Sequence, residues 1–368
     1  MIRILHYGLS ENRGGIETYL SKLWTNIDRN EYHFDFIDTN VGKPCFHDEF
    51  SEMGSKFFKI TPRKISNHKN KKDLEDLFRK EKFDILHCHL NTLSYITPIK
   101  IALKHGCKVI VHSRSSNSPA SIVTKILHNI NYFLMIPNFK KTINISVSNK
   151  AGKWLFREQI PYSVINNSVN IDKFRFSMNA RNSYREKLNL ENKFIIGHIG
   201  AYLYPKNHFY LLDVFKCYLE YKKNAVLILV GDGPLKETIQ DKVRRMNIND
   251  KVMFLGNRMD IAELLSTMDI LVFPSYYEGF PNVILEAQTS GLPCLISDSI
   301  TNEVIVIRDI CRKLSLSINP DIWAKTILEL ENVCNNRMTS FSNIKESGFS
   351  VENEIKKIED IYNLAIRK

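Results

Sequence analysis

Several features that would narrow the class of this protein are absent from its 368 residues. No uninterrupted apolar run approaches the roughly 18 residues that a membrane-spanning helix needs. The first residues run directly into a strand-like pattern, without the basic and apolar segments of a secretory signal. The glycine pattern G-x-G-x-x-G is also absent, which disfavours a nicotinamide-dependent oxidoreductase. We therefore expect a cytoplasmic protein.

Cysteine is scarce and scattered. The seven cysteines form no C-x-x-C pair and stand at positions 45, 88, 107, 217, 294, 311 and 334. Their odd number and wide spacing indicate reduced, structural thiols rather than disulfides or a zinc site. Cys88 and Cys294 lie inside apolar runs, so we expect both in the core.

The net charge of +11 is concentrated in the first half of the chain. Residues 1–170 carry 25 Lys and Arg against 15 Asp and Glu, a net charge of +10. A positive surface favours anionic partners such as phosphates, lipid head groups or nucleic acid. Because the sequence contains no nucleic-acid recognition module, we do not expect nucleic acid to be the partner.

Apolar strand-like runs alternate with helical patterns along the whole chain. Nearly continuous apolar strands between helices predict parallel sheets covered on both faces. Two such sets predict an α/β protein with two doubly wound, Rossmann-like domains. The strand-like runs are Ile2–Leu9, Phe34–Asp38, Phe57–Ile60, Asp84–Leu90, Lys108–His112 and Ile143–Ser148 in the first set, and Phe194–Gly200, Val226–Gly231, Val252–Gly256, Ile270–Pro274 and Cys294–Ser297 in the second.

The boundary between the two domains is expected in the polar, Asn-rich stretch Val164–Phe174. We place the first domain at residues 1–168 and the second at residues 169–350. The last segment, residues 351–368, has helical spacing and is expected to pack back onto the first domain. Ligands of open parallel sheets bind at the carboxyl ends of the strands. Two facing sheets therefore predict a binding site in a cleft between the domains.

The most informative segment is S-Y-Y-E-G-F-P-N-V-I-L-E, residues 275–286. It follows a strand-like run and opens into a helical pattern, with Pro281 at the expected first helical position. Backbone amides at such a helix start suit phosphate oxygens, and Glu278 and Glu286 can accept hydrogen bonds from sugar or ribose hydroxyls. The alternative is two solvated glutamates around a turn. The position after a strand favours a nucleotide-sugar site.

Two further loops carry groups that suit a diphosphate. Gly14 and Gly15 open the first helical pattern, where glycine lets a ligand approach the backbone closely. An ordinary strand-to-helix turn is equally consistent with them. Lys206 lies in the loop before another helix, where its ammonium can neutralise phosphate, although a lone loop lysine is more often solvated.

Histidines gather at the ends of two strand-like runs. His112 ends the run V-I-V-H, so we expect its ring to face the cleft and bind a sugar hydroxyl, with Arg114 able to hold phosphate. A structural histidine is the alternative. His87 and His89 alternate on one strand and share a face. Two histidines at this spacing can ligate a metal, but no third ligand of suitable spacing follows, which favours a structural or substrate-lining role.

These motifs together resemble a known family. The run from Phe254 to Gln288 with the following G-L-P, the N-terminal G-G-I-E and the element Lys206-Asn-His are similar to those of retaining GT-B glycosyltransferases of glycosyltransferase family four. The subgroup they resemble most builds bacterial exopolysaccharide and capsule. The similarity extends over nearly the whole chain.

The resemblance implies a role for each motif. Glu286 would hold the ribose hydroxyls of a nucleoside-diphosphate-sugar, taken to be a UDP-sugar, and Glu278 would contact the donor sugar. Lys206 and the Gly14-Gly15 loop would neutralise the diphosphate. The implied catalytic residues are Glu278, Lys206 and His112; further donor contacts are Asn207, Arg258, Gly279, Phe280, Pro281, Asn282 and Val283; acceptor-side candidates are His87, His89 and Arg114.

The resemblance also implies the type of reaction. Such enzymes use no metal ion or other cofactor, because side chains and helix ends stabilise the developing charge. The sugar would be transferred with retention of its anomeric configuration. The acceptor would be a glycan, one linked to a polyprenyl diphosphate.

One position departs from the family pattern R-x4-K. Ala201 stands where relatives carry an arginine five residues before the lysine. A missing transition-state contact of this kind costs roughly 10²–10³ in rate. Arg114 is a candidate replacement, because relatives carry the second histidine of His-Ser-His there. The departure leaves a second function open: a non-catalytic GT-B subunit that supports an active partner.

The basic half of the chain also predicts a membrane partner. Residues 56–72 mix aromatic and basic side chains, and Ile122–Pro137 has an apolar face followed by Lys140 and Lys141. We expect this surface to lie on anionic lipid, so that the protein associates peripherally with the inner face of the cell membrane. The alternative is a buried crossover helix beside a solvated loop.

Overall fold

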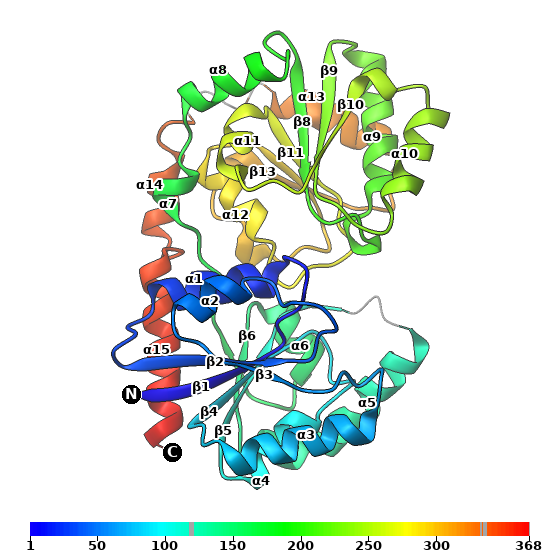
Figure 1. The fold of residues 1–368 in the computed structure, drawn as a ribbon. Helices are drawn as coiled ribbons and strands as arrows, with labels where there is room; N and C mark the ends of the chain where they lie inside the picture. Colours follow the sequence, from blue (N-terminus) through cyan, green and yellow to red (C-terminus); the bar gives the residue numbers. More distant parts are fainter. Residues whose placement is uncertain (118–120, 332, 334–336, 368) are drawn as a thin grey trace. The chain divides into compact units, whose positions relative to one another are not determined.

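The computed structural model describes residues 1–117, 121–331, 333 and 337–367. They form two compact α/β units (Figure 1). Unit 1 comprises Met1–Asn167 together with Val351–Lys368, and unit 2 comprises Ser168–Ser350. Each unit contains one parallel sheet with helices on both faces. This confirms the predicted fold class of two doubly wound, Rossmann-like domains.

Unit 1 is built on a seven-stranded sheet in the order β3-β2-β1-β4-β5-β6-β7. Neighbouring strands pair in parallel throughout. Strand β4 is buried along its whole length, as expected for a central strand covered on both faces. The strands are β1 (Ile2–Tyr7), β2 (Tyr32–Asp38), β3 (Phe57–Lys59), β4 (Ile85–Leu90), β5 (Lys108–Ser113), β6 (Ile143–Ser146) and β7 (Ser163–Val164).

The sheet of unit 1 divides its core into two clusters, and helices cover both of its faces. The last helix of the chain belongs to this unit, because its Ile358 and Tyr362 are wholly buried beside residues of the first helix. The helices are α1 (Gly15–Asn26), α2 (His47–Glu52), α3 (Asn67–Lys80), α4 (Thr97–Lys104), α5 (Ile122–Phe139), α6 (Asn149–Phe156) and α15 (Val351–Arg367).

Unit 2 is built on a six-stranded parallel sheet in the order β10-β9-β8-β11-β12-β13. Strand β9 and strand β11 are buried along their whole length. The close packing requires glycine at position 197, where a Cβ atom would lie 2.0 Å from Met268 Sδ. The strands are β8 (Phe194–Ile199), β9 (Ala225–Val230), β10 (Val252–Gly256), β11 (Ile270–Phe273), β12 (Cys294–Ser297) and β13 (Cys311–Leu314).

The helices of unit 2 cover both faces of its sheet (Figure 1). The longer ones are amphipathic and bury their apolar residues, such as Phe215 of α9 and Trp323 of α13. The α-helices are α7 (Ile171–Phe174), α8 (Met178–Lys187), α9 (His208–Tyr221), α10 (Lys236–Arg245), α11 (Ile261–Thr267), α12 (Asn282–Thr289), α13 (Pro320–Leu330) and α14 (Ser340–Glu346). Short 3₁₀ helices are η1 (Tyr204–Lys206), η2 (Asn249–Lys251), η3 (Asn302–Val304) and η4 (Arg308–Ile310).

The predicted elements differ from the observed ones mainly at their ends. Strand β1 ends at Tyr7 rather than Leu9, and α5 continues through Pro137 to Phe139. Strand β13 was not predicted, because it is an edge strand in which only Cys311 is buried and no apolar run marks it. Strand β7 was missed because it has only two residues.

The cysteines and the hydropathy agree with the sequence-based expectations where the structure describes them. The six cysteines within the described ranges form no disulfide with one another, and Cys88 and Cys294 are buried. Cys334 lies outside the described residues. Among the helices that the structure describes, none combines the length and apolar character required to cross a membrane.

Candidate functional site

Most of the predicted site residues lie on or after strands next to the points where the strand order of each sheet reverses. In unit 2 the reversal lies between β8 and β11, and in unit 1 between β1 and β4. Loops that leave neighbouring strands in opposite directions open a crevice at the carboxyl ends, where ligands of such sheets bind. The Lys206 loop follows β8 and the Glu278 loop follows β11. In unit 1 the Gly14-Gly15 loop follows β1.

The structure brings Lys206 and Glu278 into direct contact. Lys206 Nζ lies 2.7 Å from Glu278 Oε1, although 72 positions separate the residues. Both side chains remain partly accessible, at 21% and 16%. The lysine ammonium also lies 4.8 Å from the centre of the Phe273 ring, a cation–π contact. The lysine is therefore held in a defined position rather than solvated on a loop.

The two loops are joined by further contacts. The backbone N–H of Tyr276 donates to the Pro205 carbonyl at 2.8 Å, and the Tyr204 and Tyr276 rings stack with centroids 4.9 Å apart. Asn207 adopts the left-handed conformation, with φ 53°, where the 3₁₀ helix η1 ends and α9 begins. These contacts fix the Lys206 loop against the Glu278 loop.

The backbone passes close to the Lys206 side chain at Gly200, and glycine is required at Gly231. A Cβ atom at Gly200 would lie 3.2 Å from Lys206 Cδ and Cε, so the lysine side chain would have to shift by a few tenths of an ångström. Gly231 has φ +140°, and a Cβ atom there would lie 2.2 Å from the Gly200 carbonyl oxygen. Ala201, the residue after Gly200, is exposed. The residue that replaces the expected arginine thus lies on the surface beside the Lys206 loop.

The segment after Glu278 forms the predicted loop and helix with one correction. Pro281 is the N-cap residue of α12, with φ −77° and ψ 99°, and not its first helical residue. Asn282 therefore begins the helix, because Pro281 has the extended backbone of a cap rather than helical angles. Gly279, Phe280 and Pro281 are buried, and Asn282, Val283 and Glu286 are partly exposed.

Sequence reasoning missed Gln288, the residue that holds α12 in place. Its side-chain nitrogen donates to the Val304 carbonyl at 2.7 Å, and its oxygen accepts from the N–H groups of Val306 and Ile307, both at 2.9 Å. Gln288 is wholly buried. The sequence signal for this role was a glutamine inside an apolar helical pattern, two residues after Glu286, because a buried amide side chain needs hydrogen-bond partners.

Arg258 forms an ion pair with Asp260 at the surface. Its Nε donates to Asp260 Oδ1 at 2.7 Å, and Tyr184 donates its hydroxyl to Asp260 Oδ2 at the same distance. The guanidinium holds the pKa of the Asp260 carboxyl below its usual range, and the carboxylate raises the pKa of Arg258. Arg258 thus has a structural partner on the loop after β10, in addition to its predicted donor contact.

The glycine loop of unit 1 is shaped by a buried carboxylate. Glu17 accepts hydrogen bonds from the backbone of Ser10 at 2.9 Å, the Ser10 hydroxyl at 2.7 Å and the Gly14 N–H at 3.0 Å. A Cβ atom at Gly14 would lie 2.9 Å from Glu17 Oε2, whereas one at Gly15 would meet nothing within 4 Å. Packing thus explains Gly14 but leaves open space in front of Gly15.

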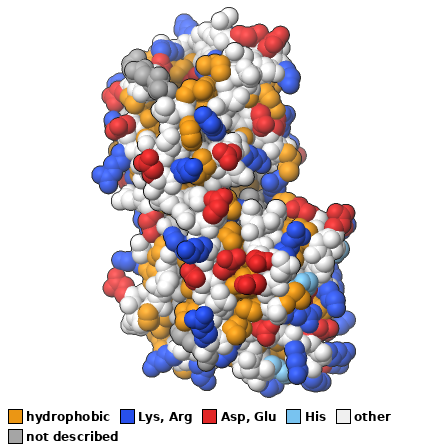
Figure 2. All heavy atoms as spheres, turned by 90° about the vertical axis from the view of Figure 1, so that its left-hand side faces the viewer, with side chains coloured by type: hydrophobic (Ala, Val, Ile, Leu, Met, Phe, Trp, Pro, Cys, Tyr) orange, Lys and Arg blue, Asp and Glu red, His pale blue; other side chains and the backbone are white. Residues whose placement is uncertain are grey.

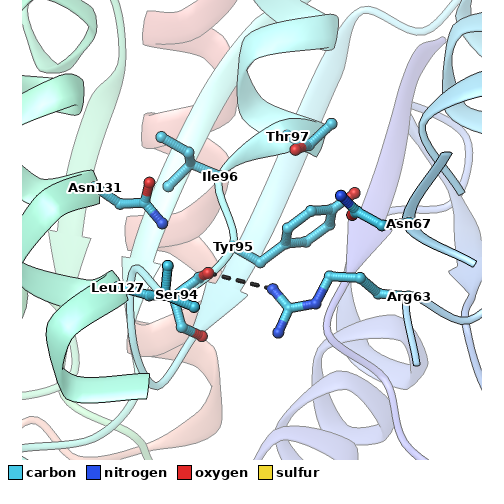
Figure 3. Close-up of a pocket in the computed structure, with 8 residues that line it drawn as sticks. All are labelled: Arg63, Asn67, Ser94, Tyr95, Ile96, Thr97, Leu127 and Asn131. Atoms are coloured by element: carbon cyan, nitrogen blue, oxygen red, sulfur yellow. Dashed lines mark hydrogen bonds between the residues drawn. The ribbon is translucent and has the colours of Figure 1, made fainter. Parts of the chain in front are cut away.

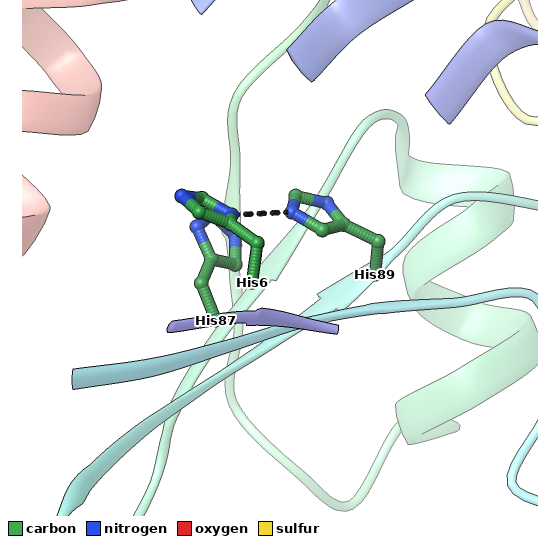
Figure 4. A group of neighbouring side chains, drawn as sticks. All are labelled: His6, His87 and His89. Atoms are coloured by element: carbon green, nitrogen blue, oxygen red, sulfur yellow. Dashed lines mark hydrogen bonds between the residues drawn. The ribbon is translucent and has the colours of Figure 1, made fainter. Parts of the chain in front are cut away.

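The histidines of unit 1 form one buried cluster. His6 of β1, His87 and His89 of β4, and His112 of β5 lie on the same face of adjacent strands, with neighbouring ring centroids 4.3–5.5 Å apart. Figure 4 shows His6 hydrogen-bonded to His89, with Nδ1 and Nε2 3.1 Å apart. Burial lowers the pKa of all four imidazoles, that of His6 to about 3, so they are neutral.

Two expectations for these histidines were wrong. The ring of His112 is wholly buried and does not face solvent, because Arg114 and Tyr19 cover it. Arg114 Nη1 lies 3.2 Å from His112 Nε2, and the Arg114 guanidinium lies over the Tyr19 ring, 4.0 Å from its centre. A third histidine does join His87 and His89, since ring nitrogens of His6 approach both within 4.8 Å. Sequence reasoning missed His6 because the pairing of β1 with β4 brings it beside His87 and His89, and residue spacing along the chain does not reveal that pairing.

Unit 1 also carries an open surface pocket of about 460 Å³. Figure 3 shows Arg63 reaching toward Ser94, whose carbonyl accepts from Arg63 Nη1 at 3.2 Å. The guanidinium also lies 4.9 Å from the centre of the Tyr95 ring. The remaining wall comes from α5 and from the starts of α3 and α4. The lining residues are Arg63, Asn67, Ser94, Tyr95, Ile96, Thr97, Leu127 and Asn131.

Two family models match the chain, one in each half. The model described as Glycosyltransferase Family 4 matches residues 13–173, and the model described as Glycosyl transferases group 1 matches residues 180–343. The two matches together span most of the chain, which therefore belongs to the glycosyltransferases that these models describe. The predicted motifs after β8 and β11 both fall within the second match.

Similar proteins cover this glycosyltransferase along its whole length. It is 28% identical to EpsF of Bacillus subtilis (strain 168), itself only provisionally assigned as a glycosyltransferase, over 100% of this chain and 97% of EpsF. It is 27% identical to the UDP-Gal:alpha-D-GlcNAc-diphosphoundecaprenol alpha-1,3-galactosyltransferase of Escherichia coli, over 98% and 96% of the two chains. Anabaena Alr3699/HepE, solved with UDP-glucose, superimposes with a TM-score of 0.80 at 17% identity, covering 99% and 100%. The fold is GT-B.

Proposed function

We propose that this glycosyltransferase transfers a sugar from a UDP-sugar to a glycan linked to a polyprenyl diphosphate, in the synthesis of a cell-surface polysaccharide. The observation that carries the proposal is the contact between Lys206 and Glu278 at the carboxyl ends of neighbouring strands. A cation beside a carboxylate, next to the start of α12, offers partners for a diphosphate and for sugar hydroxyls.

Each donor contact has a proposed role. Lys206 and the first amides of α12 neutralise the diphosphate, Glu278 accepts hydrogen bonds from the donor sugar, and Glu286 holds the ribose. Gly15 admits the ligand to the backbone, since a Cβ atom there would project into open space. Lys206 and the amides of α12 supply positive charge to the diphosphate, so the proposed reaction uses no bound metal and no other cofactor. Measuring turnover after exhaustive chelation of metal ions tests this part of the proposal, and we expect turnover to persist.

The polyprenyl-linked acceptor is inferred from the Escherichia coli relative, whose name specifies a diphosphoundecaprenol acceptor. The same name specifies UDP-Gal, which supports a UDP-sugar as donor. Retention of the anomeric configuration is proposed from the family that the motifs resemble. The coupling constant of the anomeric proton in the newly formed glycoside, measured by NMR and compared with that of the UDP-sugar, distinguishes retention from inversion.

A membrane surface is the second proposed partner, and α5 is the segment proposed to contact it. Its outward side carries large apolar residues, with Ile122 78% and Phe133 61% exposed. They recur at helical spacing within one stripe: Ile122, Val123, Ile126, Ile130, Phe133 and Leu134. Lys125, Lys140 and Lys141 are exposed beside this stripe. An apolar stripe flanked by lysines complements an anionic bilayer, where each cation contributes about 1 kcal/mol.

The distribution of charge supports the same partner. Residues 1–167 and 351–368, which form unit 1, carry the net charge of +10, and unit 2 carries +1. On the face of the molecule drawn in Figure 2, basic and acidic side chains are interspersed. In Figure 1, α5 lies at the edge of unit 1 away from α15. A peripheral enzyme at the inner membrane face would meet a lipid-linked acceptor there.

Co-sedimentation with vesicles of phosphatidylglycerol and phosphatidylcholine tests the membrane proposal. We expect binding at low salt that is lost in the double variant Ile126→Asp, Phe133→Asp. Leu364→Asp is the matched control, because Leu364 is an exposed apolar residue of a different helix. Equal binding of all three proteins, or none by the wild type, contradicts the proposal.

A second candidate function follows from Ala201. Without the arginine that relatives carry, the chain could act as a non-catalytic GT-B subunit supporting an active partner. The two functions are separated by incubating the purified protein with UDP-sugars and N-acetylglucosaminyl-diphosphoundecaprenol. Lipid-linked product formed by this chain alone supports the enzyme. UDP-sugar binding without product, together with a co-purifying glycosyltransferase, supports the subunit.

A further inference from the structure

A continuous chain of hydrogen bonds crosses the core of unit 1. Arg114 Nη1 lies 3.2 Å from His112 Nε2, His112 Nδ1 lies 3.1 Å from His87 Nε2, and His87 Nδ1 lies 2.9 Å from the hydroxyl of Tyr362. The chain runs from the end of β5 through β4 to α15. All four side chains are buried, so no solvent competes for these bonds.

Elementary donor and acceptor chemistry fixes the direction of every bond. A guanidinium only donates, so Nε2 of His112 must accept. His112 is neutral in its buried site, and its single proton is therefore on Nδ1. That N–H donates to Nε2 of His87, which places the proton of the neutral His87 on Nδ1 as well. The Nδ1–H of His87 then donates to the Tyr362 oxygen.

The reversed direction of the chain fails at its Arg114 end. If Tyr362 donated to His87, both imidazoles would carry their protons on Nε2, and the N–H of His112 would oppose the N–H of Arg114. Arg114 therefore sets the direction, and Tyr362 terminates the chain as the acceptor that the Nδ1–H of His87 requires. Without that hydroxyl, the present tautomer of His87 would leave a buried N–H unpaired, which disfavours it by about tenfold to a hundredfold.

We propose that Tyr362, on the C-terminal helix, is a positioning residue for His112: acting through His87, it stabilises the tautomer that Arg114 selects, with the lone pair of His112 on Nε2. An imidazole in this form accepts a hydrogen bond. Because the Tyr362 hydroxyl can donate as well as accept, only a donor at Nε2 keeps the chain in this direction, as Arg114 does and as a sugar O–H in its place would. This consequence rests on the proposed glycosyltransferase function, with His112 as a substrate contact.

A metal ion is the competing explanation of the cluster. Ring nitrogens of His6, His87 and His89 lie within 4.8 Å of one another, and neutral imidazoles are good ligands for transition metals. In the chain, however, the lone pair of His87 is on Nε2 and already accepts from His112. A metal held by His87 would break the chain, so the two arrangements exclude each other.

Nitrogen NMR of the protein labelled with ¹⁵N-histidine tests the chain without any substrate. We expect His87 and His112 to be Nδ1-protonated, with pyridine-type signals from both Nε2 atoms, and unchanged spectra on adding Zn²⁺ at one equivalent. Nε2-protonated tautomers in the wild type, or a Zn²⁺ ion bound through His87, would overturn the inference. Because the wild type decides this point, the test does not depend on the folding of a variant.

Two tyrosine variants test the positioning role. Tyr362→Phe should move His87 toward the Nε2-protonated form and lower kcat about tenfold to a hundredfold, with KM for the UDP-sugar nearly unchanged. Tyr32→Phe is the control, because its ring lies 5.7 Å from Tyr362 but its hydroxyl is outside the chain. A tautomer shift without loss of kcat, or equal losses in both variants, overturns the positioning role. Absence of turnover in the wild type instead contradicts the proposed function itself.

Discussion

Lys206 Nζ and Glu278 Oε1 lie 2.7 Å apart, on loops that leave adjacent strands of unit 2. The carboxylate therefore pairs with the ammonium that a diphosphate would use. The two residues are expected to have separable effects. Lysine should govern the affinity for the diphosphate, and glutamate should govern the position of the sugar.

Replacing each partner separates these effects. Lys206→Ala removes a charge-assisted contact worth about 1.5–3 kcal/mol, so the Kd of UDP should rise about tenfold to a hundredfold. Glu278→Gln removes the competing carboxylate, so UDP should bind at least as tightly, while turnover falls roughly 10²–10³-fold. Isothermal titration with UDP and a UDP-release assay give the two quantities. Equal loss of UDP affinity in both variants would show that the pair serves only to hold the loops together.

Restoring the missing cation should raise activity. Ala201 is exposed beside the Lys206 loop, so an arginine there need not be buried. We expect Ala201→Arg to increase turnover at least about tenfold, because one contact of this kind is worth 10²–10³. Ala201→Met is the control for side-chain length without charge. If both variants match the wild type, another cation already fills this role, and Arg114→Ala should then lower turnover.

Two of the glycines that follow β1, Gly8 and Gly15, should respond differently to a methyl group. Gly8 has φ +123°, and a Cβ atom would lie 2.6 Å from the His89 carbonyl oxygen, so Gly8→Ala should lower Tm. At Gly15 the same atom meets nothing within 4 Å, so Gly15→Ala should leave Tm unchanged. Turnover in Gly15→Val should fall about tenfold if a ligand approaches this backbone. Full activity in folded Gly15→Val would remove Gly15 from the site.

The buried histidines predict that stability falls in acid. The native pKa of His6 is lowered to about 3, and those of His87, His89 and His112 are also depressed, chiefly by burial. Below pH 6.5 the unfolded chain binds protons that the native protein excludes. The free energy of unfolding should therefore be highest above pH 6.5 and fall on acidification by about 1.4 kcal/mol per pH unit for each neutral histidine.

Urea denaturation between pH 7 and pH 4.5 measures this slope. His6→Phe, whose new ring would lie among Phe34 and Phe36, should reduce it by the contribution of one histidine. A wild-type stability that is constant over this range would mean that the cluster is protonated in the native state. The tautomer assignment of His87 and His112 would then be wrong as well.

The sequence was informative where local patterns carry the structure. Apolar runs marked the central strands, and the residues after β8 and β11 were recognised because a parallel sheet places such loops at one edge. Short or exposed strands such as β7 and β13 lack that pattern. The N-cap position of Pro281 differed by one residue, within the uncertainty of any helix end.

Contacts between distant segments could not be predicted in this way. His6, His87 and Tyr362 meet because β1 pairs with β4 and α15 packs on the same face, and none of these pairings is visible as a spacing. Burial of His112 under Arg114 and Tyr19 has the same origin. A chemically unusual residue in an apolar strand, such as His6, was the signal that pointed to a cluster without identifying its members.

Binding of UDP-sugars to the wild type and to Lys206→Ala tests the central claim most directly. A ligand at one hundred times its Kd stabilises the native state by about 2.7 kcal/mol, so a thermal-shift screen of UDP, UDP-glucose, UDP-galactose and their N-acetyl derivatives detects the donor. The account predicts that UDP and at least one UDP-sugar raise the Tm of the wild type, and that Lys206→Ala loses most of this shift. No shift with any of these ligands, or equal shifts in both proteins, would contradict it.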